Sequence, residues 1–134
     1  MTDMARDAIA FLDALRLTEV DLLGYSLGGM IAQEIALLRP RVVRRIVLAG
    51  TAPPRWRPSD ARLDRRHRAD RERREQPTLV ANGDNDRMIP TVNSQILADH
   101  IPNARLRIFP DAAHGFLFQY PTEFAQLVNR FLDT

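Results

Sequence analysis

The chain has 134 residues and a formal net charge of +2, and 45% of its residues are hydrophobic. This length suits one globular domain, and so small a charge does not by itself indicate a polyanionic partner. The absence of cysteine excludes disulfides and thiolate metal sites. No apolar run approaches about 18 residues and no basic segment precedes an apolar core at the N-terminus, so we expect a cytoplasmic protein without a membrane partner.

The first 54 residues alternate between helical and strand-like patterns. Residues 4–15 repeat apolar side chains at helical spacing, which predicts an amphipathic helix buried through one face: Met4, Ala8, Phe11, Leu12 and Leu15. Residues 20–23 are typical of a short buried strand, and residues 30–38 predict a helix that ends before Pro40. Residues 45–50 have a continuous apolar centre, which predicts a strand buried on both faces, as in a parallel sheet.

Residues 55–75 differ sharply in composition from the rest of the chain. They contain nine arginines and five acidic residues, and Leu63 is the one aliphatic side chain larger than alanine. A helix here would lack an apolar stripe, so we predict a charged insertion that is solvated or disordered. A nucleic-acid surface is the alternative. The acids reduce the net charge to +4 (nine minus five) and Trp56 is the one aromatic available for stacking, so we expect no nucleic-acid partner.

Two strands and two helices are predicted after this insertion. Residues 78–81 and 106–109 have strand-like patterns, and residues 92–100 predict a helix between them. The last helix begins near Pro121 and has the clearest apolar stripe of the chain: Phe124, Leu127, Val128, Phe131 and Leu132. This alternation predicts an α/β fold with about four parallel strands and flanking helices.

A G-x-S-x-G motif centred on Ser26 lies between the first strand and its following helix. A serine at such a sharp turn is forced into strained backbone angles that push its hydroxyl out of the sheet. Crowding leaves little room two residues to either side, where the chain has Gly24 and Gly28. The order of strand, motif and helix therefore predicts that Ser26 is a nucleophile.

Candidates for an acid and a base follow later strands. Asp84 and Asp86 come after residues 78–81, and His114 comes after residues 106–109. Catalytic groups collect at the carboxyl ends of parallel strands, and a serine nucleophile needs an imidazole base oriented by a carboxylate. The residues themselves leave open which aspartate is the acid.

The remaining histidines are assigned no catalytic role. We expect His100, at a helix end, to bind the terminal carbonyls, and His67 lies within the charged insertion. No further cluster of histidine and acidic residues indicates a metal site, so we expect no metal and no cofactor.

Three motifs together resemble the α/β-hydrolase family over residues 4–54 and 76–133: Gly24-Tyr25-Ser26-Leu27-Gly28-Gly29, Gly83-x-x-Asp86-x-x-x-Pro90 and Ala113-His114-Gly115. The resemblance is nearest to the serine-dependent branch, which includes small esterases, C–C bond hydrolases, enol-lactonases and cofactor-free haloperoxidases. It implies that Asp86 is the triad acid, with Asp84 as runner-up, and that the Leu27 N–H is one donor of an oxyanion hole. A serine nucleophile argues against the haloalkane dehalogenases and epoxide hydrolases.

The family pattern also includes two features that we expect this chain to lack. One is the N-terminal half-sheet, with the His-Gly loop that supplies a second oxyanion donor. The other is a helical cap, in whose place residues 55–75 stand. We therefore expect a truncated α/β-hydrolase, with residues 1–134 forming one partial domain. Without a preceding strand, residues 20–23 would have a free apolar edge, which predicts self-association or an N-terminal partner polypeptide.

Alternative functions remain open at this point. The first is a serine hydrolase of small carboxylic esters or related acyl substrates, acting through Ser26, Asp86 and His114. The second is a non-catalytic remnant or interaction domain that keeps these residues without the surrounding site. The third is a cofactor-free haloperoxidase or perhydrolase with the same triad.

Overall fold

The computed structural model describes residues 1–53 and 76–134. Within these ranges the helices and strands follow in this order: α1 (Thr2–Ala14), β1 (Val20–Tyr25), α2 (Leu27–Leu38), β2 (Val43–Ala49), β3 (Thr78–Gly83), α4 (Val92–His100), β4 (Ala104–Phe109), α5 (Phe116–Gln119) and α6 (Pro121–Leu132). Every helix and strand predicted in these ranges is present, and the short α5 is an addition. The predicted charged insertion, residues 55–75, lies outside the described residues.

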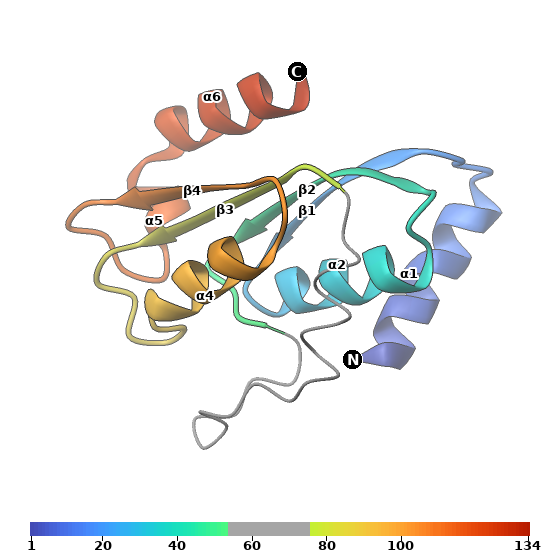
Figure 1. Cartoon of the computed structure of the whole chain (residues 1–134), viewed down its shortest axis with the longest axis horizontal. Helices are drawn as coiled ribbons and strands as arrows, with labels where there is room; N and C mark the ends of the chain where they lie inside the picture. The colour runs from blue at the N-terminus through green and yellow to red at the C-terminus, as the bar shows by residue number, and fades with distance from the viewer. Residues whose placement is uncertain (54–75) are drawn as a thin grey trace.

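The four strands form one parallel sheet whose spatial order follows the chain, β1-β2-β3-β4 (Figure 1). Leu22 of β1 lies opposite Ile46 of β2, and Val80 of β3 lies opposite Leu106 of β4. Because all the strands are parallel, their carboxyl ends meet at one edge, where loops can bring distant residues together. The predicted fold class, a truncated α/β fold with four parallel strands, is confirmed.

Helices cover both faces of the sheet (Figure 1). On one face α1, α2 and α4 pack on alternate strand residues that include Ile46 and Leu48. On the other face α5 and α6 pack on the intervening residues, such as Val47. All three of these β2 side chains are fully buried, because successive residues of a strand point to opposite faces and both faces are covered here.

The predicted stripe of α6 is the side that packs on the sheet. Phe124, Val128 and Phe131 are at most 9% exposed and form a core with Val47 and Phe109. Pro121 occupies the start of the helix, where its missing N–H costs nothing and its fixed φ suits the first turn. The C-terminal helix is therefore fixed by a continuous apolar side.

The buried side of α1 differs from the predicted one. Ala5 is fully buried and packs with Ala8 and Ile9 against the core, whereas Phe11 and Leu15 are 64% and 53% exposed. The small alanine side chains allow α1 to approach α2 closely, and this approach turns the larger apolar side chains outward. Met4 is 47% exposed as well, so the prediction that Met4, Phe11 and Leu15 lie on the buried face is wrong.

β1 is an edge strand of the sheet in the described part of the chain, because it pairs with β2 alone. Its residue Leu23 is 52% exposed. The core beneath α5 and α6 is formed by residues of β2, β3 and β4, and β1 contributes Tyr25 to it but not Leu23. The final helix thus leaves the β1 end of its sheet face uncovered.

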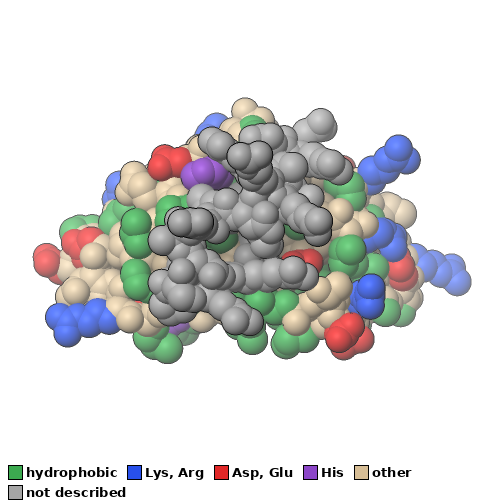
Figure 2. All heavy atoms as spheres, turned by 60° about the horizontal axis from the view of Figure 1, so that its bottom comes forward, with side chains coloured by type: hydrophobic (Ala, Val, Ile, Leu, Met, Phe, Trp, Pro, Cys, Tyr) green, Lys and Arg blue, Asp and Glu red, His purple; other side chains and the backbone are tan. Residues whose placement is uncertain are grey.

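The outer surface of the α1, α2 and α4 layer mixes apolar and charged side chains (Figure 2). None of the helices in the described ranges combines the length and the apolar character needed to cross a membrane.

Candidate active site

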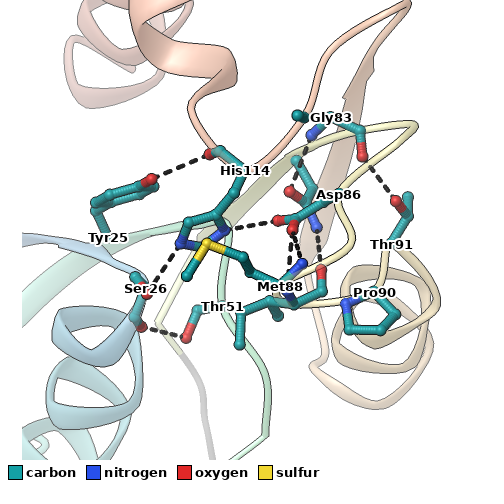
Figure 3. Close-up of polar contacts among 12 residues, drawn as sticks. Tyr25, Ser26, Thr51, Gly83, Asp86, Met88, Pro90, Thr91 and His114 are labelled. Atoms are coloured by element: carbon teal, nitrogen blue, oxygen red, sulfur yellow. Dashed lines mark hydrogen bonds and ion pairs between the residues drawn. The ribbon is translucent and has the colours of Figure 1, made fainter.

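The loops that follow β1, β3 and β4 bring three predicted residues together at one edge of the sheet (Figure 3). Ser26 directly follows β1, Asp86 lies in the loop after β3, and His114 lies in the loop after β4. The Ser26 and His114 strands are at opposite ends of the sheet, so the loop after β4 must reach across the sheet edge, and His114 lies beside Gly50 at the end of β2.

Ser26 adopts the strained backbone expected for a residue at this turn. Its φ of 53° and ψ of −121° are uncommon for a residue with a side chain. Two hydrogen bonds connect the turn to β2 and the loop after it: the Ser26 N–H donates to the Ala49 carbonyl at 2.9 Å, and the Thr51 hydroxyl donates to the Ser26 carbonyl at 2.7 Å. These bonds fasten both sides of Ser26 to the end of β2 and its following loop.

Two glycines of the motif differ in the space around them. A Cβ atom at Gly24 would lie 2.4 Å from the Gly28 carbonyl oxygen, so a side chain is excluded there, as predicted. Among the described residues, a Cβ atom at Gly28 would meet nothing within 4 Å beyond its own helix turn, so the expectation of crowding at that position is wrong. Gly29 is the second crowded position instead, because a Cβ atom there would lie 2.6 Å from the Thr51 side chain. The turn packs against β1 and the loop after β2, and Gly28 points away from both.

Asp86 is almost fully buried, with 5% of the residue exposed. Its Oδ1 accepts the N–H groups of Met88 and Ile89, both at 2.9 Å. Its Oδ2 lies 2.8 Å from Nδ1 of His114. These three donors offset the cost of burying the carboxylate and fix its orientation (Figure 3).

Asp84, the second acid left open by the sequence, lies elsewhere. Its residue is exposed, and its Oδ1 accepts the Ala112 N–H at 3.1 Å. Asp84 therefore ties the loop after β3 to the loop after β4. Gly83 makes this contact possible, because a Cβ atom there would lie 2.1 Å from the Ala112 carbonyl oxygen.

His114 connects the other two residues. Its Nδ1 lies 2.8 Å from Asp86 Oδ2, and its Nε2 lies 3.1 Å from Ser26 Oγ. One tautomer satisfies both contacts: Nδ1–H donates to the carboxylate, and Nε2 accepts the Ser26 hydroxyl. In this arrangement the imidazole can take the hydroxyl proton, and the carboxylate can stabilise the imidazolium that results.

The other histidines are not part of this arrangement. His100 Nδ1 lies 2.8 Å from the Ile96 carbonyl in the last turn of α4, as predicted for a histidine at a helix end. His67 lies outside the described residues. In residues 1–53 and 76–134, no group of three or more His, Cys, Asp or Glu side chains could hold a metal ion.

Leu27, the predicted oxyanion donor, is the first residue of α2. N–H groups in the first turn of a helix have no carbonyl acceptor within the helix, and they carry the positive end of its dipole. The Leu27 N–H therefore lies immediately after Ser26 at a helix end suited to a developing negative charge.

Two residues near the site were not predicted from the sequence. Thr51 binds the Ser26 carbonyl, and Tyr25 donates its hydroxyl to the His114 carbonyl at 3.1 Å. Tyr25 lies inside the quoted motif, but its partner is 89 residues away in the chain, and no local pattern indicates such a contact.

Comparison with known proteins finds similarity over most of the chain. A family model described as alpha/beta hydrolase fold matches residues 1–65. A 2-hydroxymuconate semialdehyde hydrolase from Pseudomonas sp. (strain CF600) is 29% identical over 186 positions, covering 93% of this chain and 66% of that protein. Serine hydrolase BPHL from Mus musculus is 24% identical, covering 96% of this chain and 60% of that protein. The structure of a meta-cleavage product hydrolase from Pseudomonas fluorescens IP01 has a TM-score of 0.87 at 20% identity, covering 98% of this chain and 71% of that chain.

The chain is shorter than these relatives and spans just under two thirds of the Pseudomonas sp. protein, 66% of its length. That match extends over 186 positions, whereas this chain has 134 residues, so the relative holds residues inside the matched stretch that have no counterpart here. The structural likeness shows a shared fold, and the two relatives matched by sequence are named as hydrolases.

Proposed function

We propose that this chain, which matches the alpha/beta hydrolase fold model over residues 1–65, is a serine hydrolase of small carboxylic esters or related acyl substrates. One observation carries the proposal. Ser26 Oγ lies 3.1 Å from His114 Nε2, and His114 Nδ1 lies 2.8 Å from the buried carboxylate of Asp86. Nucleophile, base and acid thus form a continuous hydrogen-bonded series, which is the geometry that serine acyl transfer needs.

The proposed reaction has two halves. In the first, Ser26 Oγ attacks the acyl carbon while His114 Nε2 takes the hydroxyl proton; the ester C–O bond then breaks and the alcohol leaves with that proton. In the second, His114 takes a proton from water, the resulting hydroxide attacks the acyl-serine, and the proton returns to Ser26 as the acid departs. Asp86 stabilises the imidazolium in both halves.

Exposed apolar side chains adjacent to these residues support a small apolar acyl group. Leu27 follows Ser26 and is 48% exposed, and Met88 follows Asp86 by two residues and is 71% exposed. Phe118, at 74% exposed, lies edge-on to Tyr25 with ring centroids 6.5 Å apart. Short-chain esters such as p-nitrophenyl acetate and butyrate are therefore the substrates of choice for a first assay.

A fluorophosphonate probe with an intact-mass readout tests the proposal. We expect one label per chain, lost in Ser26→Ala and retained in Ser94→Ala, because Ser94 is fully buried within α4. Ester hydrolysis should follow the same pattern. Equal labelling of Ser26→Ala and the wild type would refute the assignment of the nucleophile. A wild type that neither reacts with the probe nor hydrolyses the esters would favour the non-catalytic interaction domain.

A further inference from the structure

We infer that Tyr25 is a positioning residue that holds His114 against Ser26. The inference rests on the proposed function, in which His114 is the base. Tyr25 is the last residue of β1 and directly precedes Ser26, so it reaches His114 from the nucleophile's own strand. It makes two contacts with His114, one through its hydroxyl and one through its ring.

The hydroxyl contact fixes the backbone of the loop after β4. Tyr25 Oη donates to the His114 carbonyl at 3.1 Å. Figure 3 shows Tyr25 and Asp86 on opposite sides of His114, so the base is held from two directions. Asp86 fixes the imidazole at Nδ1, and Tyr25 fixes the backbone from which the imidazole projects.

The ring contact limits the tilt of the imidazole. The Tyr25 and His114 ring centroids are 5.0 Å apart, with an angle of 31° between the planes. Gly50 lies against both rings: a Cβ atom there would press on Tyr25 Cε2 at 3.2 Å and touch His114 Cε1 at 3.4 Å. Gly50 also has a φ of +51°, which favours glycine. Because Gly50 has no side chain, the end of β2 lets the Tyr25 and His114 rings lie close together.

The architecture explains why such a contact matters. Ser26 follows an edge strand that pairs with β2 alone among the described strands, and His114 follows β4 at the other end of the sheet. The distance between nucleophile and base therefore depends on how the loop after β4 crosses the sheet edge toward the turn after β1. Tyr25 connects this loop to the turn directly, without passing through β2 and β3.

The phenol remains a donor over the pH range of an assay. Burial raises the pKa of Tyr25 above its ordinary value, and the negative charge of Asp86 raises it further. The hydroxyl therefore stays protonated where esters are assayed, and its hydrogen bond to the His114 carbonyl persists.

Tyr25→Phe tests the inference, with Tyr120→Phe as a matched control. Tyr120 also donates its hydroxyl to a backbone carbonyl of the loop after β4, that of Pro110, at 2.8 Å. The centroid of its ring lies 5.3 Å from that of the Phe109 ring. Both variants lose one hydroxyl and one bond to the same loop. Only the first loses a bond to His114.

Two measurements separate positioning from general stability. The first is exchange with water of the proton between His114 Nδ1 and Asp86, followed by NMR. Loss of one neutral hydrogen bond should raise the population of displaced His114, and with it the exchange rate, by about 2- to 10-fold in Tyr25→Phe. The second is ester hydrolysis, in which we expect kcat to fall by about the same factor while KM stays within about twofold, because Tyr25 contacts the base and not the ester. Tyr120→Phe should leave both measurements at wild-type values.

The outcomes keep the two proposals apart. Wild-type exchange in Tyr25→Phe, or equal acceleration in both variants, would overturn the role of Tyr25. Faster exchange in Tyr25→Phe alone supports it, even in a chain whose Ser26→Ala variant still takes the label. That last result would refute the hydrolase assignment alone, since the proton exchange reports on His114 without any reaction at Ser26.

Discussion

Replacing Gly24 by alanine should be far more damaging than the same change at Gly28, although the two glycines are equivalent in the motif. A Cβ atom at Gly24 would lie 2.4 Å from the Gly28 carbonyl oxygen and 2.6 Å from Gly29 Cα. Carbon contacts are normally about 3.5–4.0 Å long. Because the obstructing atoms are backbone, the start of α2 would have to move away from β1 by roughly 1 Å to accept the methyl group.

The expected loss of stability in Gly24→Ala can be compared with that in the control variant, Gly28→Ala. Overpacking costs about 1–3 kcal/mol, and the upper end applies to Gly24→Ala because no side chain can rotate aside. The added methyl group of Gly28→Ala meets no atom of the other described elements within 4 Å and lies in α2, where alanine is favoured over glycine by up to about 1 kcal/mol. For a chain of this size, 1 kcal/mol corresponds to about 4 °C in Tm. We therefore expect Tm to fall by about 10 °C in Gly24→Ala and to stay equal or rise by up to about 4 °C in Gly28→Ala.

Thermal unfolding followed by circular dichroism measures this difference. Probe labelling at a temperature where both variants are folded adds a second readout, because a displaced α2 would carry the Leu27 N–H away from Ser26. Equal Tm values in Gly24→Ala and Gly28→Ala would refute this reasoning.

Further predictions concern the acid, a surface ion pair and the free edge of β1. Asp86→Asn should lower kcat by about 10³- to 10⁴-fold because the amide favours the wrong His114 tautomer. Asp84→Asn should lower kcat by less than about tenfold, because Asp84 binds the Ala112 N–H and not His114. The reverse ranking in the ester assay would assign the acid role to Asp84. Arg44 lowers the pKa of Asp21 through a bidentate contact, so Asp21 contributes stability above the unfolded-state pKa of about 3.9 that is lost as pH falls through the lowered folded-state pKa. Asp21→Asn should therefore lower the free energy of unfolding by up to about 1 kcal/mol at pH 7. At a pH below both the folded-state and the unfolded-state pKa of Asp21, denaturant unfolding should give the same free energy for the variant and the wild type. The wild type should self-associate at micromolar concentration in light scattering after size exclusion, and Leu23→Lys should weaken this more than Val92→Lys at the exposed start of α4; a wild type that is monomeric would contradict the proposed role of the free edge.

The sequence predicts most of the fold because its signals are local. Strands such as β2 are continuous apolar runs, and α6 has a stripe at helical spacing, so periodicity alone locates them. The buried face of α1 is decided instead by how closely α1 can approach α2 at Ala5 and Ala8. That approach depends on tertiary packing, which the spacing of apolar residues along one helix does not contain.

In the candidate site, too, some residues are predicted from local sequence motifs and others depend on tertiary contacts. Ser26 and His114 were predicted because each follows a strand within a short motif, and Asp86 was preferred on resemblance alone. The physical difference between the two acids appears only in the folded loop, where Asp86 accepts two nearby N–H groups and Asp84 turns to Ala112. Thr51 and Tyr25 contact the site across 25 and 89 residues of chain, so no short pattern could reveal them.

The order of the strands also determines when the site can form during synthesis. The turn around Ser26 obtains its backbone partners within 25 residues, from Ala49 and Thr51. His114 follows Ser26 by 88 residues and lies in the loop after β4, the fourth of the described strands. A growing chain that leaves the ribosome from its N-terminus therefore contains the partners of the serine turn long before His114 is present to take the Ser26 proton. In the proposed chemistry Ser26 stays an ordinary, weakly nucleophilic alcohol until β4 joins the sheet, so an unfinished chain would not react with esters around it.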